Sequence, residues 1–166
     1  MNRRHFLSQS LAFAGIASGV FPGLASAKAS EAEILFAQSY PDLNGVKQPL
    51  QNWQGRPVVV NFWATWCPPC VKEMPDLEAL SQKYPDVAFL GLGVDTADNM
   101  RNFLPKVQVS YDLLVVGYGG IELMKQLGNT AGGLPFTLIF NEAGRMVERI
   151  LGQVKPDALD KVLARL

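Results

Sequence analysis

The sequence is poor in the side chains that carry most metal and nucleophile chemistry, because only one of its 166 residues is histidine and only two are cysteine. The histidine, His5, lies in an N-terminal segment that has the features of an export signal. Once that segment is removed, the chain cannot build a Cys/His zinc site, a Cys–His nucleophile pair or a Ser–His–Asp triad. Two cysteines, Cys67 and Cys70, allow at most one disulfide, even in an oxidising compartment.

The chain also lacks an excess of charge of either sign, since 15 lysines and arginines balance 15 aspartates and glutamates. A neutral chain gives no electrostatic reason to expect a nucleic-acid partner. Hydrophobic residues make up 48% of the sequence and charged residues 18%, a composition typical of a folded domain and not of a disordered chain. The length fits one domain on the usual scale of about 100–200 residues.

No hydrophobic run is long enough to predict a membrane span. Residues 1–27 contain Arg3 and Arg4, an apolar stretch at 11–24 and an Ala-x-Ala sequence that ends at Ala27, which are the parts of a cleavable export signal. The apolar stretch is shorter than the about 20 residues of a spanning helix. We therefore predict cleavage after Ala27 rather than a membrane anchor, which leaves one domain at 28–166.

Two export routes stay open. The arginine pair followed by His-Phe-Leu is similar to a twin-arginine signal, which would export a folded protein, but an ordinary Sec signal can also carry two arginines. No cysteine follows the apolar stretch, which excludes a bacterial lipid anchor. Cleavage leaves 13 basic and 15 acidic side chains, so the mature domain has a small net negative charge.

The remaining chain predicts alternating strands and helices. Residues 58–63 form a continuous β-branched and aromatic run, which is typical of a strand buried on both faces in a parallel sheet. Glycine in the turn at 142–145 indicates a hairpin, and Pro156 begins a last helix. We expect a loose leader at 28–33, strands at 34–40, 58–63, 87–94, 113–116, 136–141 and 146–151, and helices after Cys70, at 96–106, near 121–127 and at 156–166.

The two cysteines lie where the buried strand gives way to a helix. Cysteines at i and i+3 around a helix N-terminus come within the about 4.4–6.8 Å Cα separation that a disulfide requires. Unpaired N–H groups and the helix dipole lower a cysteine pKa there from about 8.5 into the range of about 3.5–7.5. Because Pro68 and Pro69 have no N–H, we expect a moderate lowering of the Cys67 pKa. Such a thiol suits a reductant or mild exchanger better than a strong oxidant.

Two other interpretations of the pair stay open. A purely structural disulfide closes a loop of four residues, which stabilises a fold by only about 2 kcal/mol. A metal site built on two thiolates needs a further ligand from a carboxylate, a methionine or another chain. Dithiol–disulfide exchange is the interpretation that the position of the pair favours.

The segment 60–70, Val-Asn-Phe-Trp-Ala-Thr-Trp-Cys-Pro-Pro-Cys, with Glu73-Met74-Pro75 after it, resembles the thioredoxin superfamily and, more narrowly, the TlpA/ResA-like periplasmic oxidoreductases. The resemblance extends to 41–45 and 133–135, and so covers essentially the whole mature chain. It implies an α/β thioredoxin-like fold, with a central mixed β-sheet flanked by helices, an N-terminal strand or hairpin extension and a central insertion.

The resemblance also implies roles for individual residues. Cys67 is the exposed nucleophile that forms the mixed disulfide and Cys70 is the resolving thiol, a chemistry that needs neither a metal nor an organic cofactor. Pro135 is a cis-proline that faces the site, and Leu134 offers backbone hydrogen bonds to a bound substrate chain.

The tryptophans near the cysteines have different expected places. Trp63 ends a buried strand and is expected in the core. Trp66 precedes the nucleophile, so we expect it to form, with Pro68, part of an exposed apolar docking surface.

Glu73 is the candidate proton carrier. At about 100° per residue, it falls on the apolar stripe of its helix, one turn from Cys70, where partial desolvation raises a carboxyl pKa. The alternatives are that the side chain reaches solvent and that Pro75 distorts the helix. Asn61 stands where thioredoxins have a proton-relaying aspartate, and because asparagine cannot titrate we expect it to be a polar residue satisfied within the sheet.

Three functions remain open. The first is a periplasmic thiol:disulfide oxidoreductase, a monomer that reduces protein substrates such as apocytochrome c or a copper-site protein and takes electrons from a membrane thiol reductase. The second is a thiol peroxidase. Ala64 argues against this function, because peroxiredoxins need a hydroxyl residue at that position. The third is a copper carrier. The mature chain argues against this function, because it has no histidine to serve as a copper ligand.

Overall fold

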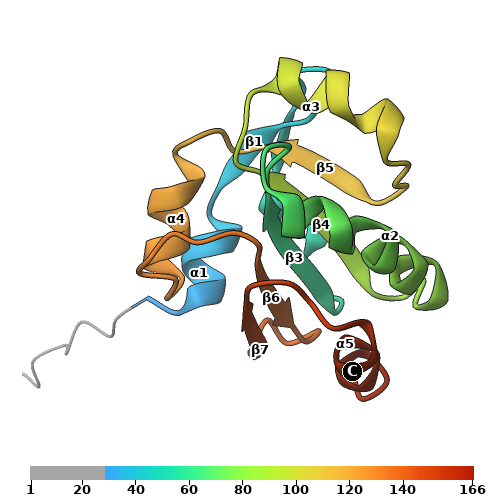
Figure 1. Ribbon diagram of the computed structural model, residues 1–166. Helices are drawn as coiled ribbons and strands as arrows, with labels where there is room; N and C mark the ends of the chain where they lie inside the picture. The colour runs from blue at the N-terminus through green and yellow to red at the C-terminus, as the bar shows by residue number, and fades with distance from the viewer. Residues whose placement is uncertain (1–28) are drawn as a thin grey trace, which may run out of the picture.

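A five-stranded mixed β-sheet forms the centre of the computed structural model, which describes residues 29–166 (Figure 1). The predicted export signal, with His5 and the arginine pair, lies outside the described residues. The strand order is β5-β4-β3-β6-β7, in which β3, β4 and β5 are parallel and β6 and β7 are each antiparallel to their inner neighbour. The strands are β3 (Val58–Trp63), β4 (Ala88–Gly93), β5 (Asp112–Val115), β6 (Phe136–Phe140) and β7 (Met146–Leu151).

Helices cover both faces of this sheet, as predicted (Figure 1). Val58, Val60 and Phe62 of β3 pack into the core on the side of α1 (Glu31–Phe36) and α4 (Gly120–Gln126). Val59 packs into the core on the side of α2 (Pro68–Lys83) and α5 (Pro156–Leu163). Because side chains alternate along a strand, Asn61 and Trp63 share the face of Val59, beneath α2.

The strand predicted at 34–40 and the loose leader predicted at 28–33 are both wrong. Residues 31–36 form helix α1, which begins in a capping box: the Ser30 hydroxyl accepts from the Glu33 backbone N–H, and the Glu33 carboxylate accepts from the Ser30 N–H. The Ser-x-x-Glu spacing is a helix-start signal that the apolar run after it obscured. Leu35 and Phe36 are buried, and the Phe36 ring packs edge-on against Phe140 at 5.3 Å.

The expected N-terminal hairpin and central insertion are both present. Strands β1 (Ser39–Pro41) and β2 (Lys47–Pro49) pair in antiparallel fashion, and η1 (Leu50–Trp53) leads from them to β3. The insertion comprises α3 (Ala97–Phe103), the short helix η2 (Leu104–Lys106) and edge strand β5. The helix predicted at 96–106 is α-helical only to Phe103 and continues as the 3-10 helix η2, because Pro105 has no N–H to donate to the carbonyl of Arg101.

No helix within residues 29–166 is both long and apolar enough to cross a membrane.

Helix α1 should contribute strongly to stability through its packing and only modestly through its cap. Phe36→Ala empties a buried aromatic site and should lower the free energy of unfolding by about 3–5 kcal/mol, whereas Ser30→Ala removes an exposed cap and should cost about 1 kcal/mol. Urea unfolding of the oxidised protein measures both, with Val147→Ala on exposed β7 as the control. Equal effects of Phe36→Ala and Val147→Ala would contradict the packing of α1 on the core.

Candidate functional site

The cysteine pair lies at the junction of β3 and α2. Residues 64–67 form a turn after β3, in which the Cys67 N–H donates to the Ala64 carbonyl at 3.2 Å. Cys67 caps α2, and its sulfur accepts from the Cys70 N–H at 3.4 Å, the one amide that the two intervening prolines leave available in this loop. Cys67 and Cys70 form a disulfide with a Cα separation of 5.3 Å, within the range predicted from their spacing.

The two sulfurs differ in their access to solvent. Cys70 is fully buried, whereas Cys67 is 4% exposed at the base of a rim that includes Trp66. Trp66 itself is 55% exposed and Trp63 is fully buried, which confirms the predicted exposure of Trp66 and the predicted core position of Trp63. Pro68, beside Cys67 at the start of α2, is also exposed. Of the two cysteines, only Cys67 therefore keeps any exposed surface, and it lies beside exposed Trp66 and Pro68.

A second loop reaches the disulfide from the start of β6. The Leu134–Pro135 peptide bond is cis, as the resemblance implied, and Phe136 pairs with Phe62 near the end of β3. This register places Pro135 beside the turn that carries the cysteines. Leu134 packs against the apolar cluster around the disulfide.

The sequence interpretation missed the residue that holds this loop in place. Asn129 is buried, and its amide donates to the Gly133 carbonyl at 2.7 Å and accepts from the Gly133 N–H at 3.3 Å. A lone asparagine in a glycine-rich loop has no distinctive sequence signal, so only the structure shows its role.

Glu73 lies on the buried face of α2, as its helical position predicted. The helix continues through Pro75, and the carboxyl group is fully buried, so the two alternatives for this residue are wrong. Glu73 accepts from the Val154 backbone N–H at 2.7 Å and from the Asn61 amide at 2.8 Å. Burial raises the pKa of Glu73 above its ordinary value, although both hydrogen bonds act to lower it.

Asn61 has a larger part in this site than predicted. Its amide nitrogen donates to Glu73 and, at 2.9 Å, to the Thr137 hydroxyl, so the donor side is satisfied within the sheet. Its carbonyl oxygen has no hydrogen-bond partner among residues 29–166. Asn61 is thus a direct hydrogen-bond partner of the buried Glu73 carboxyl group, and only the donor half of its own amide is satisfied.

Asp95 is a second buried carboxyl group, and the sequence interpretation missed it. It lies two residues after the end of β4 and is fully buried. Its oxygens accept from the Thr65 N–H and hydroxyl, from the Thr96 N–H and from the Asn99 amide. Burial raises the pKa of Asp95, but these hydrogen bonds outweigh burial and hold it below its ordinary value. Asp95 thereby ties the turn before Cys67 to the start of the central insertion.

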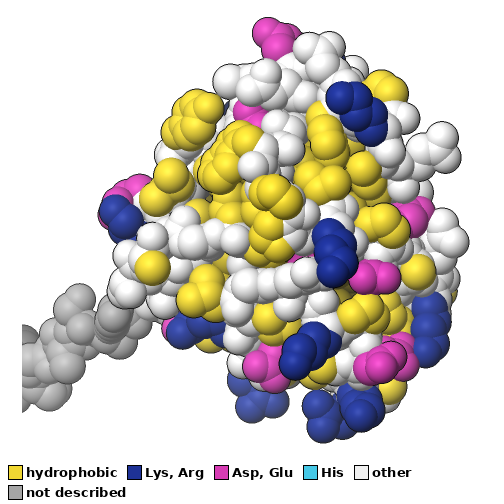
Figure 2. All heavy atoms as spheres, in the orientation of Figure 1, with side chains coloured by type: hydrophobic (Ala, Val, Ile, Leu, Met, Phe, Trp, Pro, Cys, Tyr) yellow, Lys and Arg dark blue, Asp and Glu magenta, His cyan; other side chains and the backbone are white. Residues whose placement is uncertain are grey.

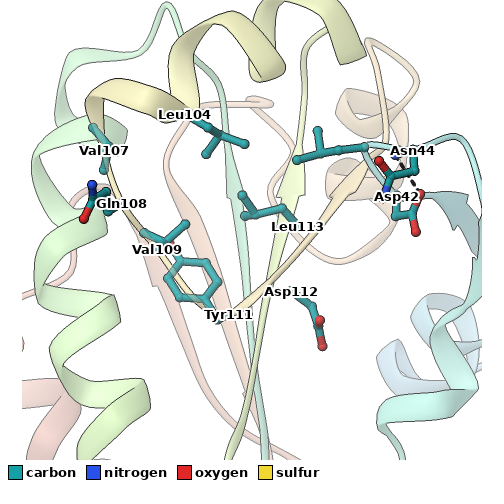
Figure 3. Close-up of a pocket in the computed structure, with 10 residues that line it drawn as sticks. Asp42, Asn44, Leu104, Val107, Gln108, Val109, Tyr111, Asp112 and Leu113 are labelled. Atoms are coloured by element: carbon teal, nitrogen blue, oxygen red, sulfur yellow. Dashed lines mark hydrogen bonds between the residues drawn. The ribbon is translucent and has the colours of Figure 1, made fainter.

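A pocket lies apart from the disulfide, between the β1–β2 turn and the central insertion (Figure 3). Figure 3 shows Leu104, Val109 and Leu113 around it, with Asp42 and Asn44 at one end. Leu104, Val109 and Leu113 also pack against the apolar cluster around the disulfide. The pocket therefore backs onto the site without opening to the sulfurs.

Within the described part of the chain, no three histidine, cysteine, aspartate or glutamate side chains gather into a group that could hold a metal ion.

The model of the Redoxin family matches residues 27–164. The chain belongs to the redoxin family. Among curated proteins, this redoxin is 31% identical over 128 residues to the thiol-disulfide oxidoreductase ResA of Bacillus thuringiensis subsp. konkukian, a match that covers 75% of this chain and 72% of the relative. It is 37% identical over 142 residues to the thioredoxin-like protein YneN of Bacillus subtilis, covering 80% and 81% of the two chains.

Solved structures show the same fold. A secreted Mycobacterium tuberculosis disulfide oxidoreductase, 23% identical, superposes with a TM-score of 0.69 over 83% of this chain and 100% of its own. A thioredoxin-related protein from Neisseria meningitidis serogroup B, 35% identical, gives a TM-score of 0.66 and covers 77% of this chain and 97% of its own. The redoxin is thus a ResA-like member of the thioredoxin superfamily, as its motifs indicated, and with its Cys-x-x-Cys pair it is a thiol:disulfide oxidoreductase.

Removal of the buried Asp95 carboxylate should destabilise this redoxin more than removal of the exposed Asp98 carboxylate in the following helix α3. Asp95→Ala removes the acceptor of the half-buried Thr65 N–H and hydroxyl and should lower the free energy of unfolding by about 1–3 kcal/mol. Asp98→Ala breaks only an exposed ion pair with Arg101 and should cost less than about 1 kcal/mol. Guanidinium unfolding compares the two variants. Equal midpoints would show that Asp95 does not hold the turn before Cys67.

Proposed function

We propose that this redoxin works in the periplasm as a protein-disulfide reductase, with Cys67 as the nucleophile and Cys70 as the resolving thiol. The observation that carries this assignment is that Cys67 keeps a small exposed area, whereas Cys70 is fully buried. This difference favours Cys67 as the cysteine that meets a sulfur of another chain. Its place as the cap of α2 also supports the assignment, because a helix N-terminus stabilises a thiolate.

The reaction is a pair of thiolate attacks on sulfur. In the reduced protein, the Cys67 thiolate attacks one sulfur of a substrate disulfide, and the other substrate sulfur leaves as a thiolate. Cys70 then loses its proton and attacks the Cys67 sulfur, which releases the second substrate thiolate and forms the Cys67–Cys70 disulfide. Two electrons pass from the pair to the substrate. A membrane thiol reductase would return the pair to the dithiol.

Glu73 is the proton acceptor in the second step. It lies one turn along α2 from Cys70, on the same buried face, and water has no direct access to it. A carboxyl group with a raised pKa can take a proton from a thiol and give it back, because its neutral form is stable in the core. Asn61 fixes the orientation of this carboxyl group through their hydrogen bond at 2.8 Å.

The substrate chain would dock on a surface formed by Trp66 and Pro68 on one side and Leu134 and Pro135 on the other. Both sides border Cys67, and the backbone of Leu134 would pair with the substrate backbone. The names of the relatives support disulfide exchange as the reaction of this surface, including the thiol:disulfide interchange protein HelX of Rhodobacter capsulatus, 34% identical over 110 residues. This match covers 64% of this chain and 58% of HelX. Apocytochrome c and copper-site proteins are the substrates that we propose.

The location rests on the N-terminal sequence. Residues 1–27 have the charged, apolar and Ala-x-Ala parts of an export signal, and we propose that cleavage after Ala27 releases the domain at 28–166 into the periplasm. The secreted state of the similar Mycobacterium protein agrees with export.

The reduction potential of the pair tests the direction of electron flow. Because Pro68 and Pro69 remove two N–H donors from the loop, we expect the Cys67 pKa to be lowered moderately and the potential to lie near the about −270 mV of thioredoxin. Equilibration with glutathione and thioredoxin, followed by quantification of free thiols, measures it. A potential near the about −120 mV of DsbA would contradict the role of reductant.

Glu73→Gln tests the proton acceptor. The amide keeps the size of the side chain and one of its two acceptor oxygens but cannot take a proton, so Cys70 should lose its proton at higher pH and the resolving step should slow by about 10²-fold or more. Thiol titration of the reduced protein and stopped-flow exchange with a peptide disulfide measure these effects. Glu122→Gln, which changes an exposed carboxyl group on α4, is the matched control. Unchanged Cys70 titration and exchange rate in Glu73→Gln would overturn the role.

The same variant should change the dependence of stability on pH. Because the folded pKa of Glu73 is raised above its ordinary value of 4.5, the folded protein retains a proton that the unfolded chain loses, so its stability falls as pH rises from that value to the folded pKa. Glu73→Gln should remove this fall. Urea unfolding of the oxidised protein across this range checks the sign.

A further inference from the structure

Three buried polar atoms in one region of the core have no hydrogen-bond partner within residues 29–166. They are the side-chain oxygen Oδ1 of Asn61, the indole nitrogen Nε1 of Trp63 and the hydroxyl oxygen Oη of Tyr111. Native cores pair nearly all such atoms, either with protein groups or with ordered water. Three of them in one place therefore point to a small ligand that they share.

The register of the sheet directs the Asn61 oxygen toward β4. Asn61 lies between Thr137 of β6 and Gly91 of β4, and residues opposite each other in register lie on the same face of a sheet. The Asn61 amide nitrogen donates to the Thr137 hydroxyl, on the β6 side. Because the nitrogen and the oxygen lie on opposite sides of the amide carbon, Oδ1 is directed to the other side, toward Gly91.

Gly91 leaves room for the other two atoms. A Cβ atom placed on Gly91 would lie 3.2 Å from Trp63 Nε1 and 3.3 Å from Tyr111 Cε2, the ring carbon next to the one that carries the hydroxyl. Both side chains therefore approach the same point above β4. The same Cβ would lie 2.5 Å from Leu113 Cδ2, so any larger residue at position 91 would displace the side chains around this point.

One water molecule can satisfy all three atoms. The Trp63 N–H can only donate, the Asn61 oxygen can only accept, and the Tyr111 hydroxyl can do either. A water that accepts from Trp63 can donate one hydrogen to Asn61 and the other to Tyr111, and about three hydrogen bonds are typical of a buried water. The three atoms belong to uncharged groups and would not balance the charge of an ion.

The orientation of the Asn61 amide decides which of its atoms meets Glu73. In the structure, Nδ2 donates to the Glu73 carboxylate at 2.8 Å. Burial raises the pKa of Glu73, and this hydrogen bond acts against the rise. The reverse orientation would place Oδ1 against the carboxyl group, where only protonated Glu73 can pair with it. A water held by the Trp63 N–H favours the observed orientation, because its hydrogens need an acceptor such as Oδ1.

Glu73 depends mainly on its neighbours in the core for its charge state. Basic and acidic side chains stand out on the surface in Figure 2, whereas Glu73 is fully buried. Among titratable groups, the charge of Asp76 on α2 acts on Glu73, and the charge of Glu73 acts on Tyr111. The groups that donate to the carboxylate, the Asn61 amide and the Val154 N–H, are uncharged. The Val154 donor is fixed in the backbone, so the Asn61 amide is the donor that can turn.

We propose that Asn61 Oδ1, Trp63 Nε1 and Tyr111 Oη bind one buried water molecule, which holds the Asn61 amide with its nitrogen toward Glu73. Trp63 and Tyr111 are thus positioning residues that act on Glu73 through the water and Asn61. The water site rests only on the hydrogen-bonding groups of the core, whereas its effect on disulfide exchange rests on the role of proton acceptor proposed for Glu73.

Magnetisation transfer from water to the Trp63 indole N–H tests the site by NMR in the oxidised, isotope-labelled protein. The indole should show a nuclear Overhauser peak at the water frequency, with the sign of a water that stays bound for longer than the protein takes to tumble. Trp63→Phe identifies the indole signal by its loss. Tyr111→Phe removes a hydroxyl that exchanges with water itself and leaves the bound water two partners, so the peak should persist. Absence of the peak in the unaltered protein, or its loss in Tyr111→Phe, would contradict the water site.

The pKa of Glu73, measured by carbon NMR of its carboxyl group, tests the effect on Asn61. Tyr111→Phe should raise this pKa by about 0.5–1, because a water with two partners fixes the amide less firmly. Tyr118→Phe, which removes an exposed hydroxyl, is the matched control and should leave the pKa unchanged. An unchanged or lowered pKa in Tyr111→Phe would overturn the proposal.

Two further measurements separate the possible failures. In an Asn61→Ala background, whose fold circular dichroism checks, Tyr111→Phe should no longer change the Glu73 pKa, and a rise of the same size there would show that Asn61 does not transmit the effect. The pH profile of the resolving step, measured by stopped-flow exchange with a peptide disulfide, should move upward with the Glu73 pKa in Tyr111→Phe. A raised pKa with an unmoved profile would support the water site and reject Glu73 as the proton acceptor.

Discussion

Strand β3 is buried along its whole length, and this constraint places every part of the site. Because β3 is central in the sheet, the chain can reach the surface only where this strand ends. The turn at 64–67 follows directly after that end. The same strand pairs with β4, which leads to Asp95, and with β6, which begins after Pro135. Thus the turn after β3, the segment after β4 and the loop before β6 meet near Cys67, because β4 and β6 are both neighbours of β3.

Buried polar groups then refine this arrangement. Glu73 and Asp95 are both fully buried, but their surroundings move their pKa values in opposite directions. Asp95 accepts from four donors, which stabilise its charged form and fasten the turn beside Cys67. Glu73 accepts from two, so burial dominates and the neutral form is favoured. A charged carboxylate suits a structural turn, whereas a carboxyl group with a raised pKa suits proton transfer.

The surface around the disulfide has a different character from these interior groups. Trp66 and Pro68 are exposed on the turn that carries Cys67, whereas Trp63 below them is buried. The central insertion does more than extend the sheet, because Asp95 at its start holds Thr65 of this turn.

The sequence by itself determined the chemistry and most of the fold. Local signals were sufficient for this: a β-branched run for β3, two cysteines three apart at a helix start for the disulfide, and helical periodicity for the buried face of Glu73. Where two local signals competed, prediction failed, and the apolar run after Ser30 was assigned to a strand although the capping box begins helix α1.

Only the tertiary structure decided which distant residues meet. The hydrogen bonds of Asp95 to Thr65 and of Asn61 to Thr137 join residues 30 and 76 positions apart, and the sequence contains no periodicity at such separations. Residue types set what each side chain can do, but the packing of the sheet sets its neighbours, and neighbours determine the burial, charge state and access on which the reaction depends.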